Sequence, residues 1–238
     1  MGKTAAAAGA TDRGKVRPEN EDGYLVDAEQ HVYAVADGLG GLPEGGLASS
    51  VALDTLKREL ANEHATINLD SLFKTVNQAV CEEGQGIDNE LGIGTTLTLM
   101  AVEGQTMRIA HVGDTGIYRF REGKAEKLTT DHTMAQEMLE RLPEDERERA
   151  YIPEYYHHTL TRCIGRPGTV KVDLLEVDYE PGDRILLYSD GVTKTLEPHE
   201  LGSLITGSDD AESCVRAIIG TANDRGGPDN ITAVAVFL

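Results

Sequence analysis

The sequence predicts a mixed α+β protein, because segments typical of strands and segments with the period of amphipathic helices both occur along it. Residues 106–112 and 117–120 are apolar runs separated by a glycine-containing turn, which favours strands. Residues 69–80 instead carry apolar side chains at helical spacing. The hydrophobic fraction of 39% is enough for a sizeable core, which must be mostly aliphatic because aromatic residues make up only 5% of the chain.

The N-terminal half is expected to begin with a flexible lead-in over residues 1–10, which show no apolar periodicity, and residues 11–238 are expected to form one domain. Pro18 disfavours helix at Arg17, so the charged segment that contains them is predicted to be extended or turning. Apolar runs and helical periods then predict the following elements: strands at 24–26 and 32–36, helices beginning near 48 and 69, strands at 95–102, 106–112 and 117–120, and a hairpin turning at 122–123.

The C-terminal half begins with residues 131–165, whose length and polarity are typical of a surface insertion beside a functional site. Within this insertion we expect a helix at 134–142, and the charge run at 144–149 is interpreted as a solvated helix face. The remaining elements are predicted in this order: strands at 170–177 and 184–189, helices at 198–205 and 209–222, and a closing strand at 232–237.

The formal charge of −19, from 41 acidic and 22 basic residues, argues against nucleic acid and anionic membrane as partners, since both require a basic surface. No apolar run approaches the roughly 20 residues of a membrane helix. The first residues lack the apolar core of a signal peptide, and the three cysteines form no CxxC pair. We therefore expect a soluble, cytoplasmic protein, and a monomer.

Three aspartates share one local context, a junction between a strand and a glycine-rich turn. Asp37 ends the apolar run 32–36 and is followed by Gly38, Gly40 and Gly41. Taken alone, it would be interpreted as an ordinary Asp-Gly turn. Asp190 repeats this pattern after the apolar run 184–188, and Asp229 lies in a Gly/Pro loop before the last strand.

Three carboxylates that converge on one place repel one another unless protons or metal ions neutralise them. A ligand set of oxygens without histidine or cysteine favours Mg²⁺ or Mn²⁺. Two such ions, about 3.5–4 Å apart, can activate a bridging water and hold both oxygens of an in-line displacement at phosphorus. Arg17 is the candidate for binding the phosphate, because its guanidinium forms a planar fork of donors.

At this point the sequence resembles the metal-dependent PPM (PP2C-type) protein serine/threonine phosphatases in their bacterial form. Eight blocks match the family's motifs in family order: 17–22 (Arg-Pro-Glu-Asn-Glu-Asp), 35–41 (Val-Ala-Asp-Gly-Leu-Gly-Gly), 94–97 (Gly-Thr-Thr-Leu), 112–115 (Val-Gly-Asp-Thr), 128–132 (Leu-Thr-Thr-Asp-His), 160–165 (Leu-Thr-Arg-Cys-Ile-Gly), 189–192 (Ser-Asp-Gly-Val) and 229–230 (Asp-Asn). Each block alone is weak evidence, whereas eight in order are strong evidence.

The resemblance implies a four-layer α-β-β-α sandwich, in which two antiparallel sheets pack face to face and helices cover both outer faces. By similarity, Asp37 bridges two metal ions, Gly38 contributes its carbonyl, and Asp190 and Asp229 complete the pair. Asp22 is expected to act through metal-bound water, with Glu21 nearby.

A third, weaker ion would be held by Asp114 together with Asp190, and residues 131–165 correspond to the family's flap, which borders the substrate cleft. The substrates implied are phosphoserine and phosphothreonine in proteins, attacked by a water or hydroxide that bridges the metals. In signalling, the enzyme would oppose a bacterial Ser/Thr kinase.

Two positions depart from the family pattern. Many eukaryotic members carry a histidine, proposed as general acid, where this chain has Leu39, so no protein acid is assigned. The usual Asp-Ser-Arg of the middle block is Asp114-Thr115-Gly116 here, which leaves the third metal site less well defined.

Two other functions fit parts of the sequence. A catalytically weak phosphopeptide-binding module on the same fold would keep the binding groups without turnover, although every required metal aspartate is present. A nucleotide-binding enzyme could use residues 38–41 as a phosphate cradle, but the chain lacks the Walker lysine pattern.

Overall fold

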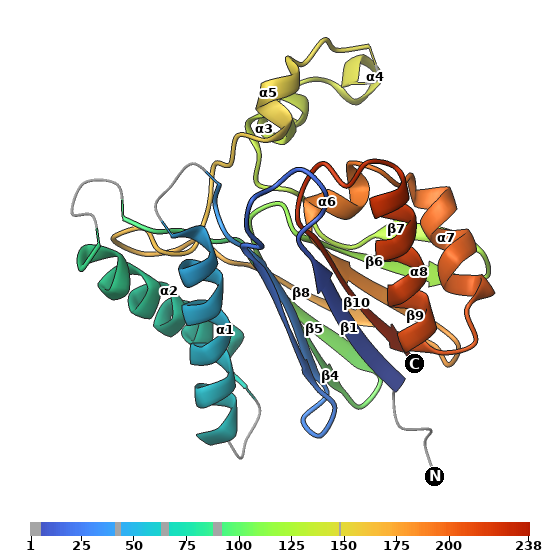
Figure 1. Cartoon of the computed structure of the whole chain (residues 1–238), viewed down its shortest axis with the longest axis horizontal. Coiled ribbons are helices and arrows are strands. Elements are labelled where there is room, and N and C mark those ends of the chain that lie inside the picture. Colours follow the sequence, from blue (N-terminus) through green and yellow to red (C-terminus); the bar gives the residue numbers. More distant parts are fainter. Residues whose placement is uncertain (1–5, 41–43, 63–66, 88–91, 148) are drawn as a thin grey trace.

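Two five-stranded antiparallel sheets form the centre of the molecule in this computed structural model (Figure 1). The structure describes residues 6–40, 44–62, 67–87, 92–147 and 149–238. Part of the predicted lead-in (residues 1–5), Gly41 of the first metal block and residue 148 of the charge run lie outside these described residues.

The first sheet has the strand order β1-β10-β9-β6-β7, and the second has the order β2-β3-β4-β5-β8. Their bounds are β1 Ala6–Asp12, β2 Asp22–Asp27, β3 Val32–Asp37, β4 Leu97–Glu103, β5 Thr106–Val112, β6 Gly116–Arg121, β7 Lys124–Lys127, β8 Asp173–Asp178, β9 Arg184–Tyr188 and β10 Ile231–Phe237. The helices are α1 Gly45–Asn62, α2 Leu69–Gln85, α3 Met134–Glu140, α4 Glu144–Arg147, α5 Glu154–His157, α6 Asp190–Thr193, α7 Pro198–Gly207 and α8 Ala211–Asp224.

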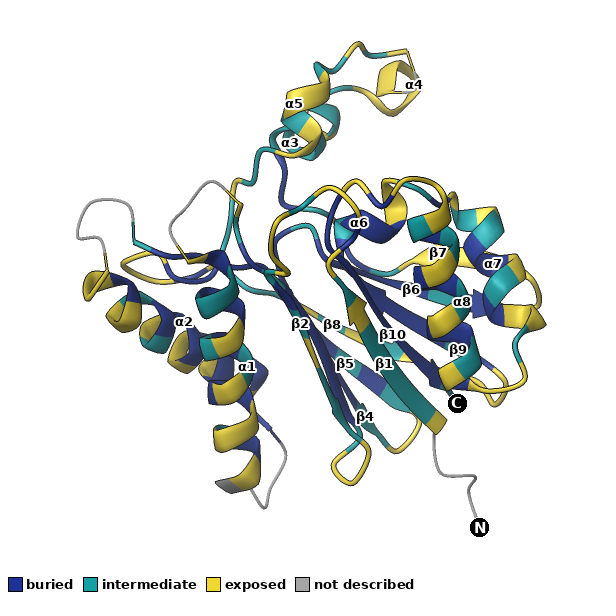
Figure 2. Cartoon of the chain, viewed as in Figure 1, coloured by how far each residue is buried: buried dark blue, intermediate teal, exposed yellow. Residues whose placement is uncertain are grey.

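Three separate apolar cores show that the molecule is layered. One lies between α1, α2 and the second sheet, one lies between α7, α8 and the first sheet, and the third lies between the two sheets. Figure 2 shows the central strands as buried, while α1 and α2 expose their outward faces. The predicted four-layer α-β-β-α sandwich is confirmed by this arrangement.

Strand β3 shows why a buried strand in this fold is a continuous apolar run. Successive side chains of a strand point to opposite faces of the sheet. Val32 and Ala34 accordingly pack in the core beneath α1 and α2, whereas Tyr33 and Val35 pack between the two sheets. Because both faces are covered, the strand shows no polar alternation, and Asp37 follows directly from this buried run at the C-terminal end of the strand.

The prediction of a flexible lead-in over residues 1–10 is wrong for residues 6–10, which belong to strand β1. This strand pairs along its whole length with β10, from Ala6 opposite Phe237 to Asp12 opposite Ile231. Its alanines and glycine lack the apolar periodicity that predicts strands. The backbone ladder to β10 and packing near α8 stabilise it instead.

The predicted insertion 131–165 contains the short helices α3, α4 and α5, which project from one end of the sandwich (Figure 1). Both ends of this flap are tied to the body, because the amide of His132 donates to the carbonyl of Gly113 at 2.7 Å and the amide of Ile164 donates to the carbonyl of Thr95 at 2.8 Å. Helix α3 ends at Glu140, two residues before the predicted end, ahead of Pro143.

Among the helices that the structure describes, none combines the length and the apolar character needed to cross a membrane.

Candidate active site

Asp37 and Asp22 are cross-strand partners at the same end of the second sheet. The register of β2 and β3 places Asp22 directly opposite Asp37. The main chain of Asp37 is fixed by two threonines of the 94–97 block. The Asp37 amide donates to Thr96 Oγ1 at 3.0 Å, and Thr95 Oγ1 donates to the Asp37 carbonyl at 2.9 Å. The position of this carboxylate is therefore set by the segment just before β4 as well as by its own strand.

Asp22 is buried, and only one of its carboxylate oxygens has a partner within the protein. Ser189 Oγ and Thr232 Oγ1 both donate to Asp22 Oδ2 at 2.7 Å. Oδ1 is buried without any hydrogen-bond partner. A buried carboxylate oxygen without a partner is costly, so this atom indicates a missing proton donor or cation at the site.

The first sheet supplies Asp190 and Asp229. Asp190 begins α6, with only Ser189 between it and the end of β9, and only Asn230 separates Asp229 from the start of β10. Glycine is required beside Asp190, because a Cβ on Gly191 would lie 1.9 Å from the carbonyl oxygen of Asn230. The same restriction applies beside Asp37, where a Cβ on Gly38 would lie 2.2 Å from the carbonyl oxygen of Gly45. Both Asp-Gly pairs therefore mark close backbone approaches.

Arg17 reaches the site from the loop between β1 and β2. Its Nε and Nη2 atoms contact Asp229 Oδ1 and Oδ2 at 2.8 and 3.0 Å, so the ion pair is bidentate. The loop is anchored by Asn230, whose Nδ2 donates to the carbonyls of Arg13 at 2.9 Å and Glu19 at 2.8 Å. Asn230 Oδ1 also accepts the amide of Glu21 at 2.9 Å.

A pocket of about 130 Å³ gathers these side chains between the ends of the two sheets. Residues of both sheets, the Arg17 loop and the flap line it together: Arg17, Glu21, Asp37, Gly38, Leu39, Gly40, Thr96, Asp114, His158, Leu160, Asp190, Lys194, Asp229 and Asn230. The structure thus brings together Arg17, Asp37, Gly38, Asp114, Asp190 and Asp229, which the sequence singled out, and Asp22 lies beside Asp37 in the ladder.

The carboxylates do not titrate as ordinary surface acids. Burial and the neighbouring carboxylates of Asp22 and Asp190 raise the pKa of Asp37 well above its usual range. Burial raises the pKa of Asp22 to about 6, although hydrogen bonds from Ser189 and Thr232 act against the shift. Burial, followed by the charge of Asp190, also raises the pKa of Asp114 to about 7. Such shifts are expected where like charges are held together away from water.

Asp229 behaves in the opposite way because two cations bind it. Burial alone would raise its pKa, but the hydrogen bond and charge of Lys194, with a further contribution from Arg17, lower it below the usual range. Lys194 Nζ lies 2.5 Å from Asp229 Oδ2 and 2.6 Å from Asp190 Oδ2. The lysine therefore bridges two of the predicted metal ligands.

The residues present fit a pair of divalent cations. Their donor atoms are oxygens, the ligand type that Mg²⁺ and Mn²⁺ prefer. Asp22 Oδ1 lacks a partner, and the positive groups of Arg17 and Lys194 already occupy carboxylate oxygens at the site. In the part of the chain that the structure describes, however, no three acidic, histidine or cysteine side chains are arranged to hold an ion as they stand.

Sequence reasoning assigned no role to Lys194, Ser189, Thr232 or His158. Lys194 falls one helical turn after Asp190, and that i,i+4 spacing was the only signal available for it. Ser189 and Thr232 look like ordinary strand-end residues, and only the pairing of sheets shows that both reach Asp22. His158 comes from the flap, and its Nδ1 atom lies 3.9 Å from Asp190 Oδ2.

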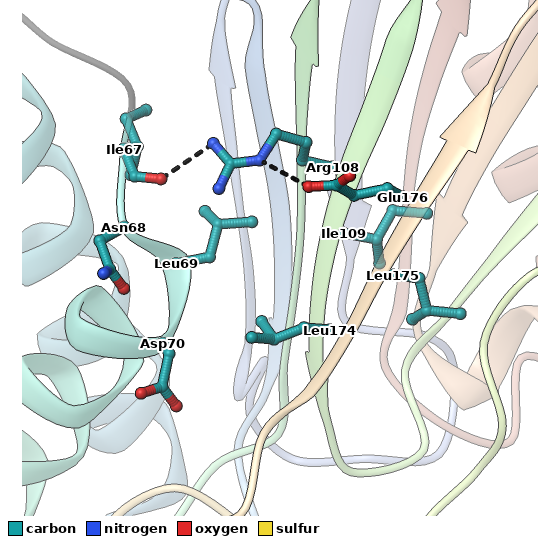
Figure 3. A pocket seen from close by; sticks show the side chains of 9 residues that line it. All are labelled: Ile67, Asn68, Leu69, Asp70, Arg108, Ile109, Leu174, Leu175 and Glu176. Carbon is teal, nitrogen blue, oxygen red and sulfur yellow. Dashed lines mark hydrogen bonds and ion pairs between the residues drawn. The ribbon is translucent and has the colours of Figure 1, made fainter.

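A larger hollow, of about 570 Å³, lies away from this cluster, between the N-terminus of α2 and strands β5 and β8 (Figure 3). Its one guanidinium, from Arg108, donates to the carbonyl of Ile67 at 2.9 Å and pairs with Glu103 at 2.8 Å. Because Arg108 is already bound within the protein and the other lining groups are mainly aliphatic, size does not identify the reactive site here.

Comparisons with known proteins agree with this geometry. The sequence profile described as protein phosphatase 2C matches residues 16–233. A putative protein phosphatase 2C-type protein of Streptococcus pyogenes is 32% identical over 236 residues, which are 95% of this chain and 94% of that protein.

Solved structures give the same result. The PPM Ser-Thr phosphatase MsPP from Mycobacterium smegmatis, determined in complex with cacodylate, superposes with a TM-score of 0.85 and 35% identity, and 98% of each chain is covered. The catalytic domain of the serine threonine protein phosphatase PstP, determined in complex with 2 manganese ions, superposes with a TM-score of 0.84 and 28% identity over 98% of this chain and 97% of that one. Since the profile covers most of its length and these proteins match it from end to end, the chain belongs to the protein phosphatase 2C family.

Proposed function

We propose that this protein is a metal-dependent phosphatase that removes phosphate from phosphoserine and phosphothreonine in proteins. The observation that carries the proposal is the single pocket in which Asp37, Asp190 and Asp229 lie with Arg17. Family membership and the manganese-bound PstP structure support metal dependence. Several carboxylates with one arginine fork suit the hydrolysis of a phosphate monoester better than the binding of a neutral ligand.

The acidic residues that the sequence singled out each have a role in this proposal. Asp37, the carbonyl of Gly38, Asp190 and Asp229 would hold two Mn²⁺ or Mg²⁺ ions, and Asp22 would support them from beneath the pocket. Asp114 together with Asp190 would hold a third, weaker ion. When bound, the ions supply Lewis-acid activation of water and neutralise charge that develops at phosphorus.

Arg17 would bind the phosphate of the substrate. Burial lowers its pKa, but the charges of Asp229 and its neighbours outweigh that effect and raise the pKa above the usual value, so the guanidinium stays charged. In the present structure both Nε and Nη2 of Arg17 contact Asp229. When divalent ions neutralise that carboxylate, the same planar fork can bind two phosphate oxygens. Asn230 keeps the loop at the required distance through its three hydrogen bonds.

The biological setting that we propose is bacterial signalling, in which the enzyme opposes a Ser/Thr kinase in the cytoplasm as a monomer. The cysteines Cys81, Cys163 and Cys214 are free thiols, which suits a reducing compartment. Phosphoproteins are the proposed substrates because similar proteins are named serine/threonine phosphatases.

The test is hydrolysis of a phosphothreonine peptide and of an aryl phosphate, measured with EDTA and after addition of Mn²⁺ or Mg²⁺. We expect no turnover in EDTA, recovery with either ion, and a loss on the order of 10²-fold or more in Asp190→Ala. Asp70→Ala is the matched control, because Asp70 forms the same i,i+4 pair with a lysine on the exposed face of α2. Activity that survives chelation, or an undiminished Asp190→Ala, contradicts the proposal. Metal binding without turnover would instead favour a phosphopeptide-binding module.

A further inference from the structure

Lys194 is the residue in the pocket whose chemistry the proposed function leaves unused. It follows the short helix α6, and its amide donates to the carbonyl of Asp190 at 2.8 Å. The side chain then turns back toward the carboxylate of the same aspartate, one helical turn earlier, and is only 25% exposed. Lys194 is therefore held against the site by both its main chain and its side chain.

The ammonium occupies carboxylate oxygens that an ion would need. Lys194 Nζ contacts Asp190 Oδ2 at 2.6 Å and Asp229 Oδ2 at 2.5 Å. Mg²⁺ binds carboxylate oxygens at roughly 2.0–2.1 Å, so an ion between these two aspartates would share its space with the nitrogen. The ammonium would also repel that ion, since like charges at such short range interact strongly away from bulk water.

Arg17 reinforces the occupation of Asp229 but leaves Asp190 to the lysine. Both oxygens of Asp229 contact the guanidinium, whereas Asp190 Oδ2 contacts Lys194 closely and His158 at 3.9 Å. Among the described residues, no three acids, histidines or cysteines converge as a ready ligand set. Asp190 and Asp229 instead each contact a tethered cation.

The hollow beside the pocket offers space for the Lys194 ammonium when an ion displaces it. Lys194 lines both the catalytic pocket and an adjoining hollow of about 450 Å³. That second hollow is also lined by the carboxylates of Asp114, Asp131 and Glu154. A rotation of the flexible lysine side chain would move its charge from Asp229 toward these acids.

We propose that Lys194 is a tethered competitor of divalent cations, which neutralises Asp190 and Asp229 in the metal-free protein and has to be displaced before the two aspartates bind an ion. The inference rests on the proposed metal-binding role of these aspartates. Lys194 would therefore have two opposite effects: it stabilises the metal-free protein, and it lowers the affinity of the protein for metal.

The first measurement is calorimetric titration of Mn²⁺ into metal-stripped wild type, Lys194→Met and Lys194→Arg. We expect Lys194→Met to bind Mn²⁺ about tenfold or more tightly than wild type, because removing the charge removes the competitor. Lys194→Arg keeps the charge and should stay within about threefold of wild type. Lys127→Met is the matched control, since Lys127 also lines the adjoining hollow but forms its i,i+4 ion pair with Asp131, which is not one of the two metal aspartates.

The second measurement is thermal unfolding of the same proteins, first in EDTA and then in saturating Mn²⁺. Lys194→Met should unfold at a lower temperature than wild type in EDTA, because Asp190 and Asp229 lose their neutralising partner. In Mn²⁺ this difference should disappear or reverse. If Lys194 only stabilised the fold, its replacement by methionine would lower both the unfolding temperature and the affinity for Mn²⁺. If Lys194→Met does not fold in EDTA, Lys194→Gln serves in the same two assays.

The outcomes separate the two proposals. Unchanged or weaker Mn²⁺ binding in Lys194→Met or Lys194→Gln overturns the role of the lysine and leaves the metal centre intact. If wild type and both variants bind no Mn²⁺, the proposed metal centre itself is wrong, and the competition falls with it.

Discussion

At the scale of single residues, Asn230 joins two parts of the chain that are far apart in sequence. It follows Asp229 directly and precedes β10, yet its amide contacts the carbonyls of Arg13 and Glu19 and the amide of Glu21. Asn230 therefore fixes the loop that carries Arg17 against the strand end that carries Asp229. One side chain thus determines the distance between the proposed phosphate clamp and a proposed metal ligand.

We predict that Asn230→Ala lowers kcat/KM for a phosphopeptide by at least tenfold and also lowers stability. The substitution leaves up to three backbone groups of the loop without partners, at about 1–3 kcal/mol for each one that stays buried. Steady-state kinetics in saturating Mn²⁺ and urea unfolding of the same preparation measure the two effects.

Asn68→Ala is the control, because Asn68 caps α2 far from the pocket by accepting the amide of Ser71 at 2.9 Å. It should cost about 1 kcal/mol of stability and leave kcat/KM unchanged. If Asn230→Ala retained wild-type kcat/KM, the loop would not depend on this residue for its position.

At the scale of elements, the same junction is built twice, once in each sheet. Strand β3 ends in Asp37-Gly38, and strand β9 leads into Asp190-Gly191 at the start of α6. In both, the glycine lets another backbone approach to a distance that a side chain would prevent. The repeated Asp-Gly pattern is therefore a packing requirement as well as a source of ligands.

Gly191→Ala should be among the most damaging small substitutions in the protein. Its Cβ would lie 1.9 Å from the carbonyl oxygen of Asn230, so α6 and the start of β10 must separate. We expect a loss of about 3 kcal/mol or more in unfolding free energy, together with a large loss of Mn²⁺ affinity.

Gly220→Ala makes the same chemical change within α8, where a Cβ would meet nothing within 4 Å. It should stabilise the protein by about 0.5–1 kcal/mol, because alanine favours helix more than glycine does. Urea unfolding of both variants in EDTA and in Mn²⁺ makes the comparison. Equal effects from the two substitutions would contradict the packing argument.

The elements with strong periodicity were predictable, and the weakly patterned ones were not. The apolar stripe of α2, with Leu69, Phe73 and Val76 buried, was predictable from spacing alone. Strand β1 was missed because its alanines and glycine give no period, and only its partner β10 makes it a strand. Helix α6 is four residues long, which is too short for any helical period to appear in the sequence.

At the scale of the whole molecule, the grouping of site residues could be predicted, but their partners could not. Glycine-flanked aspartates at strand ends, together with the family blocks, pointed to one pocket, and the structure places Asp37, Asp114, Asp190 and Asp229 in it. The contact of Lys194 with Asp229 spans 35 positions in the sequence, and those of Ser189 and Thr232 with Asp22 span 167 and 210. Such contacts depend on how the two sheets pack, which local patterns do not specify.

A buried histidine links the second sheet to the base of the flap. His111 is fully buried in β5, and its Nε2 donates to the carbonyl of Thr130 at 3.0 Å, because a carbonyl can only accept. Its Nδ1 therefore accepts from Thr98 Oγ1 at 2.8 Å. Burial, and then the ring of His132 at a centroid distance of 4.7 Å, lower the pKa of His111 to about 3, with Asp173 opposing the shift and Lys127 adding to it.

The depressed pKa of His111 predicts that this residue contributes a loss of stability as the pH falls below about 6.5, the usual histidine value. Between that pH and about 3 the unfolded chain binds a proton that the folded protein does not, so the free energy of unfolding decreases as the pH decreases. From pH 7.5 to pH 5 the expected loss from His111 alone is about 2 kcal/mol. Burial also lowers the pKa of His132, which adds to the loss, whereas the raised pKa values of Asp22 and Asp114 act in the opposite direction.

His111→Gln separates this contribution from the others, because glutamine can still donate to the Thr130 carbonyl but does not titrate. Urea midpoints in EDTA at pH 7.5 and pH 5 give the change in unfolding free energy for each protein. Wild type should lose about 2 kcal/mol more than His111→Gln over this interval, whatever their stabilities at pH 7.5. Equal changes of unfolding free energy in the two proteins would mean that His111 becomes protonated in the folded state. Water or a counter-charge would then have to reach the contact between β5 and the base of the flap.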